Sequence, residues 1–196
     1  NMLCMQSNPK YQDILKTGKE LFWKYGIKRV TIEEICKVAE VSKMTFYKFF
    51  PNKIELAKTI LDETMQVAMN KFNKIVVSDM LFSKKLEALF FMKIEAVKNF
   101  SREFINDIYT NPNLGLVKYL EEKSELFKNE ITSFYKSAQA NGQIRKEVNI
   151  DFIMAYSSHM PKLLEDEKLM EQYKSPIDFI LEVMNLLFYG IVTGNE

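Results

Sequence analysis

Apolar residues at helical spacing fill the first part of the chain, and side chains that can cap helices interrupt them at short intervals. The first apolar stripe, with steps of three and four, comprises Tyr11, Ile14, Leu15, Gly18, Leu21 and Phe22. This spacing predicts a helix that ends at Gly26, a residue suited to the left-handed position that closes helices. A second helix should begin after Thr31, which can form a capping box with Glu34.

Two further caps follow closely, at Ser42 and at Asn52. Val41 and Phe46 flank the first of them as a hydrophobic staple, and Pro51 keeps the preceding helix from continuing. The helices between the caps are about eight residues long, too short to be stable alone, so they must pack on one another. Two short helices joined by a tight turn and braced by a longer helix form a helix-turn-helix.

Helical spacing continues through the rest of the chain. The expected helices cover residues 52–76, 82–100, 101–110, 113–141 and 149–165. Pro161 is expected to kink the helix over 149–165 or end it early. A last helix should begin with Ser175 as its cap and Pro176 as its first residue. Only 6 Gly and 5 Pro punctuate the 196 residues, too few for many strands and turns, so the sequence predicts an all-α fold.

The last helix is apolar on nearly every side. From residue 179 to residue 188, only Glu182 and Asn185 are polar. Its own bundle can cover one face, so a partner chain should cover the other, with the last two helices of each subunit forming a four-helix interface. The expected interface residues are Phe152, Leu181, Met184 and Phe188. The alternative is a helix at the centre of a monomer.

The run from Thr31 to Leu56 resembles the DNA-binding signature of the TetR family. It has a Thr-led second helix, a Val-Ser turn, a third helix containing Thr-aromatic-Tyr, and then Phe-Pro-x-Lys-x-x-Leu. Two positions depart from the pattern: Glu40 stands where the family usually has Gly, and Met44 stands where it often has a small residue. Either Glu40 adopts a left-handed conformation at a modest cost, or the turn differs slightly.

The resemblance implies that this segment binds double-stranded operator DNA, as a homodimer on a palindrome. A recognition helix enters the major groove by its N-terminal part, so the residues expected to meet bases or flanking phosphates are Lys43, Met44, Tyr47 and Lys48. The residues suited to hold phosphates are Thr31, Ser42, Thr45, Tyr47 and Lys53, and the resemblance makes Tyr47 and Lys53 typical phosphate contacts. Thr31 and Ser42 cap helices with or without DNA. Lys43 and Lys48 are, in the alternative, ordinary solvated lysines.

The charge distribution agrees with contact to a polyanion. Residues 1–60 hold 11 Lys and Arg against 6 Asp and Glu, whereas the remainder holds 16 against 20. A basic segment on a mildly acidic body is typical of a protein that touches nucleic acid with one end. Chance variation in surface charge is the alternative.

The resemblance also implies a small-molecule inducer bound in the C-terminal helices. The candidate pocket residues are Phe91, Phe100, Phe104, Tyr109, Phe134, Tyr156 and His159. Aromatic residues at helical spacing are more often core than ligand contacts, and a lone histidine is more often a hydrogen-bonded interface residue. The sequence does not identify the inducer.

Other classes of function find little support. With one His, no glycine-rich phosphate loop and no Cys cluster, the chain offers neither an activated nucleophile nor a metal site, so we expect no enzyme and no cofactor. No stretch approaches the roughly 18 uncharged residues of a membrane helix, and we see no secretory leader. We therefore expect a cytoplasmic protein that does not associate with membranes.

These observations combine into one prediction. Residues 1–55 form an N-terminal three-helix helix-turn-helix domain, and residues 56–196 form a C-terminal helical bundle for ligand binding and dimerisation. The resemblance implies a transcriptional repressor that a small molecule releases from its operator. The alternative is a dimeric DNA-binding protein regulated by a partner protein.

Overall fold

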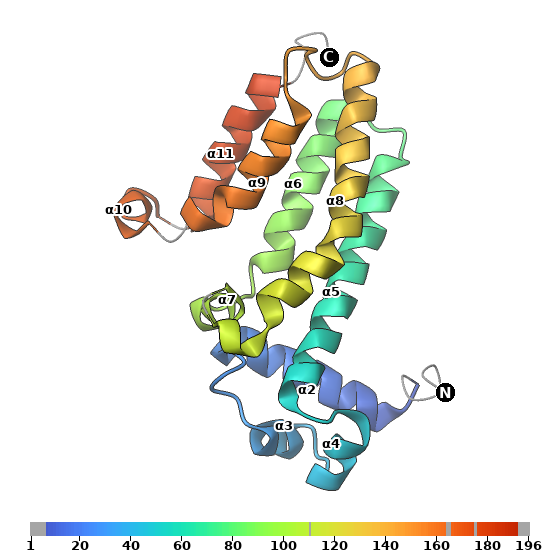
Figure 1. Cartoon of the computed structure of the whole chain (residues 1–196), viewed down its shortest axis with the longest axis vertical. Helices are drawn as coiled ribbons and strands as arrows, with labels where there is room; N and C mark the ends of the chain where they lie inside the picture. The colour runs from blue at the N-terminus through green and yellow to red at the C-terminus, as the bar shows by residue number, and fades with distance from the viewer. Residues whose placement is uncertain (1–6, 110, 164–165, 175, 192–196) are drawn as a thin grey trace. The chain divides into compact units, whose positions relative to one another are not determined.

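The computed structural model describes residues 7–109, 111–163, 166–174 and 176–191, and its regular elements are helices (Figure 1). They are α2 (Pro9–Tyr25), α3 (Ile32–Val38), α4 (Lys43–Phe49), α5 (Lys53–Val76), α6 (Phe82–Val97), α7 (Arg102–Tyr109), the short 3-10 helix η1 (Pro112–Leu114), α8 (Leu116–Ala140), α9 (Ile150–Leu163), α10 (Glu167–Met170) and α11 (Pro176–Ile191). The all-α prediction is confirmed, and no helix in the described ranges is long and apolar enough to span a bilayer.

The chain divides into two compact units. The first unit comprises residues up to 69 together with residues 96–124, and the second unit comprises residues 70–95 together with the chain from 125 onward. Residues 96–124 thus pack with the N-terminal segment, which the division of the sequence after residue 55 did not anticipate. That residues 1–55 form the DNA-binding part of the chain remains a proposal.

Side-chain caps begin the helices of the first unit where the sequence predicted them. The Thr31 hydroxyl accepts the Glu34 backbone N–H at 3.1 Å, and the Glu34 carboxylate accepts the Thr31 N–H at 2.8 Å, which completes the capping box of α3. The Ser42 hydroxyl accepts the Thr45 N–H at 3.0 Å and begins α4. The Asn52 side chain accepts two N–H groups in the first turn of α5, each at 2.9 Å.

Two residues with positive φ lie in the turns between these helices. Gly26 follows α2 with φ 82° and ψ 159°, a conformation open almost only to glycine, rather than the left-handed helical one that was predicted. Glu40, between α3 and α4, has φ 52° and is the one non-glycine residue with positive φ in the described part of the chain. Of the two alternatives for Glu40, the left-handed conformation is therefore correct.

A Glu40→Gly variant should be more stable than the parent protein. The left-handed conformation costs an L-residue roughly 1–2 kcal/mol, whereas glycine adopts it freely and gives back about 0.5–1 kcal/mol in unfolded-state entropy. The net gain of up to about 1 kcal/mol corresponds to a rise in Tm of about 2–4 °C, measured by circular dichroism on heating. Glu40→Ala removes the same charge and keeps the strain. An equal gain in that variant would contradict the backbone explanation.

An aromatic cluster holds α4 in place. Phe46 is fully buried and Phe50 nearly so, and Tyr11 of α2 stacks on Phe50 with ring centroids 5.1 Å apart. Tyr11 also meets the half-buried Phe49 edge-on, at 5.7 Å. The three phenylalanines thus belong to the hydrophobic core of the first unit. Because they occupy the inner side of α4, its other side is left to solvent.

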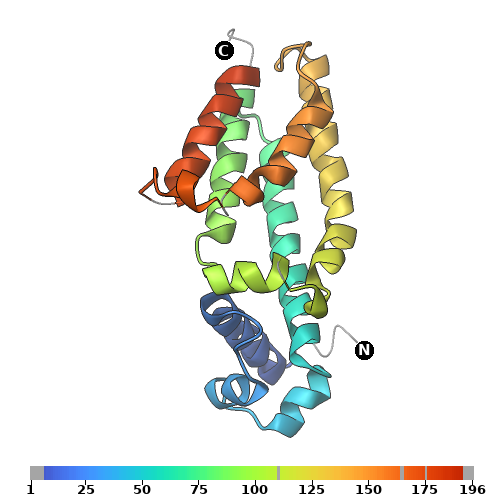
Figure 2. The same cartoon turned by 60° about the vertical axis from the view of Figure 1, so that its left-hand side comes forward.

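In the second unit, α6, α8, α9 and α11 run side by side around a second apolar cluster (Figures 1 and 2). Its buried members are Phe82, Leu86, Ala138, Ile144, Ile150, Ile153 and Ile191. Helix α9 passes through Pro161 and ends at Leu163, so the proline does not end the helix at its own position. The predicted cap Ser175 lies outside the described residues, and α11 begins at Pro176 as expected.

Candidate nucleic-acid interface and cavities

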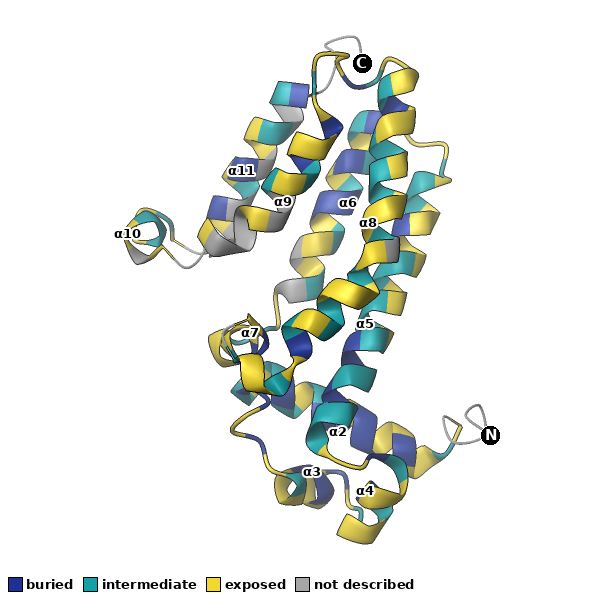
Figure 3. Cartoon of the chain, in the orientation of Figure 1, coloured by how far each residue is buried: buried dark blue, intermediate teal, exposed yellow. Residues whose placement is uncertain are grey.

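One side of α4 carries four long side chains into solvent. Met44 is 82% exposed and Tyr47 is 54% exposed, and both lysines, Lys43 and Lys48, are exposed as well. Figure 3 shows exposed residues along α4. Their spacing along the helix, at i, i+1, i+4 and i+5, places them on one face, opposite the buried Phe46. The structure therefore gathers the four residues predicted to meet bases on a single exposed surface, here called the α4 surface.

The hydroxyl groups at the start of α4 are arranged as a pair. The Ser42 and Thr45 hydroxyl oxygens lie 2.9 Å apart, so one donates to the other. Because each hydroxyl has one proton, the accepting hydroxyl keeps an O–H that can still donate to a phosphate oxygen. Thr31 differs, since its hydroxyl donates to the Glu34 carboxylate at 3.1 Å within the capping box. Its proton is therefore already used.

Lys43 has a partner that was not predicted from sequence. Its ammonium group forms an ion pair with the Glu33 carboxylate of α3, and both side chains are more than half exposed. The hydrogen bond from Lys43 to Glu33 raises the pKa of Lys43, and the same contact lowers the pKa of Glu33. The two residues lie ten positions apart on different helices, so no spacing rule within one helix connects them. A phosphate that binds Lys43 must compete with Glu33.

Lys53, predicted to hold a phosphate, contacts the backbone of its own chain. Its ammonium group donates to the carbonyl of Lys28 at 2.8 Å and to the carbonyl of Val30 at 2.7 Å. Burial of the side chain lowers the pKa of Lys53. An ammonium group has three N–H donors, so one remains for a phosphate. The lysine thus braces the loop before α3, and its contact with DNA stays a prediction.

The seven residues predicted to line a ligand pocket do not lie together. Three of them belong to the first unit: Phe104 is 1% exposed and packs against Phe100 with ring centroids 4.9 Å apart, while Tyr109 is exposed. Phe100 also packs on Trp23 of α2, at 5.0 Å. These contacts make Phe100 and Phe104 part of the hydrophobic core of the first unit.

The other four lie in the second unit, on three helices. Phe91 of α6 and Phe134 of α8 line separate cavities. On α9, Tyr156 packs on Phe152 with ring centroids 6.2 Å apart, and the Nδ1 atom of His159 lies 2.8 Å from the Ala155 carbonyl oxygen. Tyr156 and His159 line neither of the two cavities described below.

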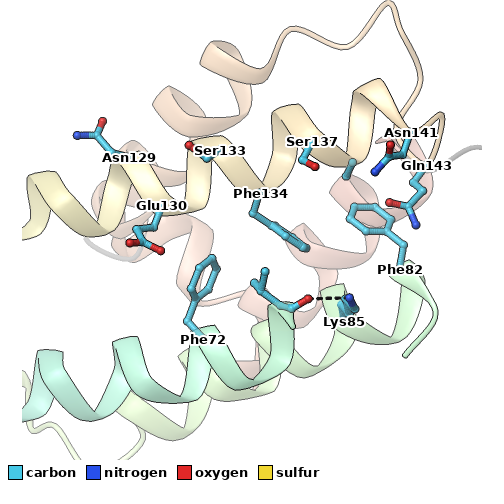
Figure 4. Close-up of a pocket in the computed structure, with 12 residues that line it drawn as sticks. Phe72, Phe82, Lys85, Asn129, Glu130, Ser133, Phe134, Ser137, Asn141 and Gln143 are labelled. Atoms are coloured by element: carbon cyan, nitrogen blue, oxygen red, sulfur yellow. Dashed lines mark hydrogen bonds between the residues drawn. The ribbon is translucent and has the colours of Figure 1, made fainter. Parts of the chain in front are cut away.

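Phe134 and Phe91 each line a cavity of the second unit. The larger of these two cavities, about 670 Å³, lies between residues of α5, α6 and α8 (Figure 4). Phe134 points from α8 toward Phe72 and Phe82, with ring centroids 6.0 and 5.6 Å away. Polar side chains form much of the remaining wall, and they are Asn129, Glu130, Ser133, Ser137, Asn141 and Gln143. Lys85 donates to the Val76 carbonyl at 2.7 Å, so its ammonium group is already engaged.

The smaller cavity, about 410 Å³, lies between residues of α6, α8, α9 and α11. Most of its wall is apolar, but Lys93 of α6 also lines it. Lys93 was not among the residues predicted from sequence, although a signal was present. The residue follows Phe90 by three positions in the apolar stripe of α6, where a lysine interrupts an otherwise hydrophobic face.

The four predicted dimer-interface residues have different surroundings. Phe152 on α9 is 64% exposed, and Leu181 on α11 lines the smaller cavity. Met184 and Phe188 belong to α11, but their side chains lie outside the described part of the structure. Another apolar residue of α11, Leu186, is 69% exposed. Large apolar side chains thus face solvent on both α9 and α11.

Sequence comparison finds similar proteins. Residues 14–60 match the family described as bacterial regulatory proteins, tetR family. A curated relative, the uncharacterized HTH-type transcriptional regulator YhgD of Bacillus subtilis (strain 168), is 26% identical over 129 residues. The aligned part is 66% of this chain, and the chain spans 66% of the length of that relative.

Solved structures resemble the whole fold. The fatty acid degradation regulator FadR from Bacillus halodurans is 17% identical with a TM-score of 0.70, over 94% of this chain and 97% of that one. A putative TetR-family transcriptional regulator from Rhodococcus sp. is 18% identical with a TM-score of 0.70, over 94% of this chain and 99% of that one. The helical arrangement described above is thus shared with known regulators.

Proposed function

Because the chain belongs to the TetR family of bacterial transcriptional regulators, we propose that it represses transcription as a homodimer on a palindromic operator and that a small molecule releases it. As a member of this family, the protein is a DNA-binding regulator and not an enzyme. The repression of transcription, the palindromic form of the operator and the release by a small molecule are proposals.

The observation that carries the proposal is the α4 surface. Helix α4 is capped at Ser42, and buried aromatic rings on its inner side hold it in place. Its exposed side carries Lys43, Met44, Tyr47 and Lys48. A short, rigidly held helix with exposed basic and apolar side chains fits the major groove, where lysine meets guanine or phosphate and methionine meets the thymine methyl. The first turn of this helix would enter the groove.

Removal of the Glu33 charge should strengthen operator binding. Glu33 pairs with Lys43 beside the α4 surface and would repel phosphates there. Glu33→Gln frees the lysine in both subunits, so we expect roughly 3- to 10-fold tighter binding at low salt and a steeper dependence of log K on log salt. Fluorescence anisotropy with labelled operator DNA measures both. Glu87→Gln removes an equal charge in the second unit and should leave both quantities unchanged. Weaker binding by Glu33→Gln would contradict the proposed role of Lys43.

The exposed apolar side chains of α9 and α11 support dimerisation. Phe152 is 64% exposed and Leu186 is 69% exposed, while Phe179 and Val183 of α11 are buried in their own unit. A second copy of the chain covering these residues would remove apolar surface from water. Two recognition helices related by a two-fold axis then meet half-sites about 34 Å apart, which requires a palindromic operator.

A charge at Leu186 should break the dimer. Leu186→Glu places two carboxylates in the proposed interface, and the desolvation cost should raise the dimer dissociation constant at least roughly 100-fold. Sedimentation velocity at micromolar concentration should show a monomer, and circular dichroism should show an intact helical fold because the side chain is exposed in the monomer. Val67→Glu, at an exposed apolar residue of α5, is the control. A dimer that survives Leu186→Glu would exclude this interface.

Release by a small molecule is supported by two cavities in the second unit, of about 670 and 410 Å³, which fall in the range of ligand sites. Proteins of similar fold include a fatty acid degradation regulator, a ketosteroid transcriptional regulator and a gamma-butyrolactone receptor. A ligand that binds one conformation better than the other would shift the dimer away from the DNA-bound state.

Transcription in vitro, from a promoter that carries the selected operator, tests the sign of regulation. We expect the transcript to decrease as the protein is added, because a bound dimer blocks polymerase. Addition of a ligand found by thermal-shift screening should restore the transcript. An increase in transcript would show activation and contradict repression. A repressor that no small molecule releases, but that a cell extract releases through a protein fraction, would favour regulation by a partner protein.

A further inference from the structure

The smaller cavity of the second unit combines apolar walls with two lysines, Lys84 and Lys93. Its volume is about 410 Å³, and its apolar walls include Leu86, Leu89, Phe90, Ile153, Leu181 and Leu187. Lys93 lies one helical turn after Phe90, on the side of α6 that lines the cavity. Its ammonium group is therefore a charged group that a ligand between these apolar walls would meet.

Lys93 has no ion-pair partner in the described part of the chain. The acidic residue of the lining, Glu87, is paired with Lys84 at 2.6 Å, so its charge is already balanced. Solvent reaches the Lys93 side chain, which is exposed, while the surrounding protein atoms desolvate the ammonium group and lower the pKa of Lys93. An anion beside Lys93 would favour its charged form and would supply the partner that the lining does not.

Three neutral polar residues line the same cavity, and one of them is Ser83 of α6. Tyr135 comes from α8 and Asn185 from α11. Burial raises the pKa of Tyr135, so its hydroxyl stays protonated and can donate a hydrogen bond. The Asn185 amide contributes two further N–H donors. The polar part of the wall thus offers several hydrogen-bond donors. Such a wall suits a ligand group that only accepts hydrogen bonds, such as a carboxylate.

We propose that this cavity binds an amphipathic carboxylate, with its carboxylate at the Lys93 ammonium group and its apolar chain against the leucine and phenylalanine walls. The inference rests on the proposed release by a small molecule, because it names the chemical class of that ligand. A neutral apolar ligand would leave Lys93 unpaired, and an amine would place two cations together. Both arrangements are less favourable than the ion pair.

Three probes of equal chain length separate these possibilities: decanoate, decanol and decylamine. Each is titrated by calorimetry into the full-length protein without DNA. Decanoate should bind with one site per subunit and at least roughly tenfold tighter than decanol, and decylamine should bind most weakly. Decanol binding as tightly as decanoate, or no binding of decanoate at all, would overturn the proposal.

Lys93→Met tests the ammonium group itself, because it removes the charge and keeps an unbranched side chain. Decanoate affinity should fall roughly 10- to 100-fold while decanol affinity stays within about twofold. Lys128→Met removes the same charge from α8, at a residue that does not line this cavity, and should leave decanoate affinity within about twofold. Without ligand, Lys93→Met should raise Tm by about 2–4 °C, since an unpaired cation is removed. An equal loss of decanoate affinity in both variants would indicate general electrostatics and contradict a specific site.

Failure of this inference can be told apart from failure of the proposed function. The titrations contain no DNA, so the loss of decanoate binding would leave operator binding and repression untouched. Decanoate that binds through Lys93 but does not weaken operator binding would support the site and contradict its use for release. If decanoate weakens operator binding by the wild-type protein but not by Lys93→Met, both the site and its use for release would be supported.

Discussion

Phe46→Ala should lose about 3–5 kcal/mol of unfolding free energy, since it removes a fully buried ring from the cluster below α4. Stabilities of single domains are about 5–15 kcal/mol, so this loss is a large fraction of the total. Urea unfolding measures it. The single tryptophan, Trp23, packs on Phe100 in the first unit, so its fluorescence reports the unit that contains α4.

The matched control is the next residue on the same helix. Tyr47 is 54% exposed, so Tyr47→Ala should change the unfolding free energy by less than about 1 kcal/mol. Phe46→Ala should also weaken operator binding, because α4 loses its support, although Phe46 does not reach solvent. A loss below about 1 kcal/mol for Phe46→Ala would show that the cluster does not hold α4.

The double variant Tyr47→Ala, Lys48→Ala should keep its stability and lose operator affinity. Each interaction between the α4 surface and DNA is worth about 1 kcal/mol or more, and the dimer makes each of them twice, so we expect binding to weaken roughly 100-fold or more. The dependence of log K on log salt should become less steep by about one for each phosphate interaction that is removed. Anisotropy titrations over a salt series measure both quantities.

Lys128→Ala provides the control for charge. Lys128 is an exposed lysine of α8 that pairs with Glu125 at 3.5 Å, in the second unit. Its removal changes the net charge by the same amount as the removal of Lys48 and should leave the operator affinity within about twofold. Equal losses in the two variants would mean that net charge, and not the α4 surface, governs binding.

The features that could be predicted from sequence are those that local interactions determine. The caps at Thr31, Ser42 and Asn52 act within three residues of their own positions, so their residue types and spacing were sufficient to place the helix starts. The exposure of the α4 surface also depends on nearby residues, because Phe46 and Phe50 are buried on the inner side of this short helix. The α5 helix was likewise expected over nearly the range that it occupies.

The features that were missed depend on contacts between distant parts of the chain. Glu33 reaches Lys43 only because α3 and α4 pack in the first unit. Phe100 and Phe104 resembled pocket residues by type, but residues 96–124 pack with the N-terminal segment, and the two rings meet the core there. Residue type alone does not separate an aromatic that fills a core from one that lines a cavity. For Lys93, the interruption of an apolar stripe was the available signal.

The most direct test of the central claim is selection of genomic DNA fragments by the purified protein, followed by affinity measurement over a salt series. We predict that the protein selects a palindromic site and loses roughly 10³–10⁵ in affinity between about 50 and 200 mM salt, as expected for about 6–10 phosphate contacts. Selection of no fragment above the genomic background, with equal affinity for every sequence, would contradict the account of the α4 surface as a reader of DNA.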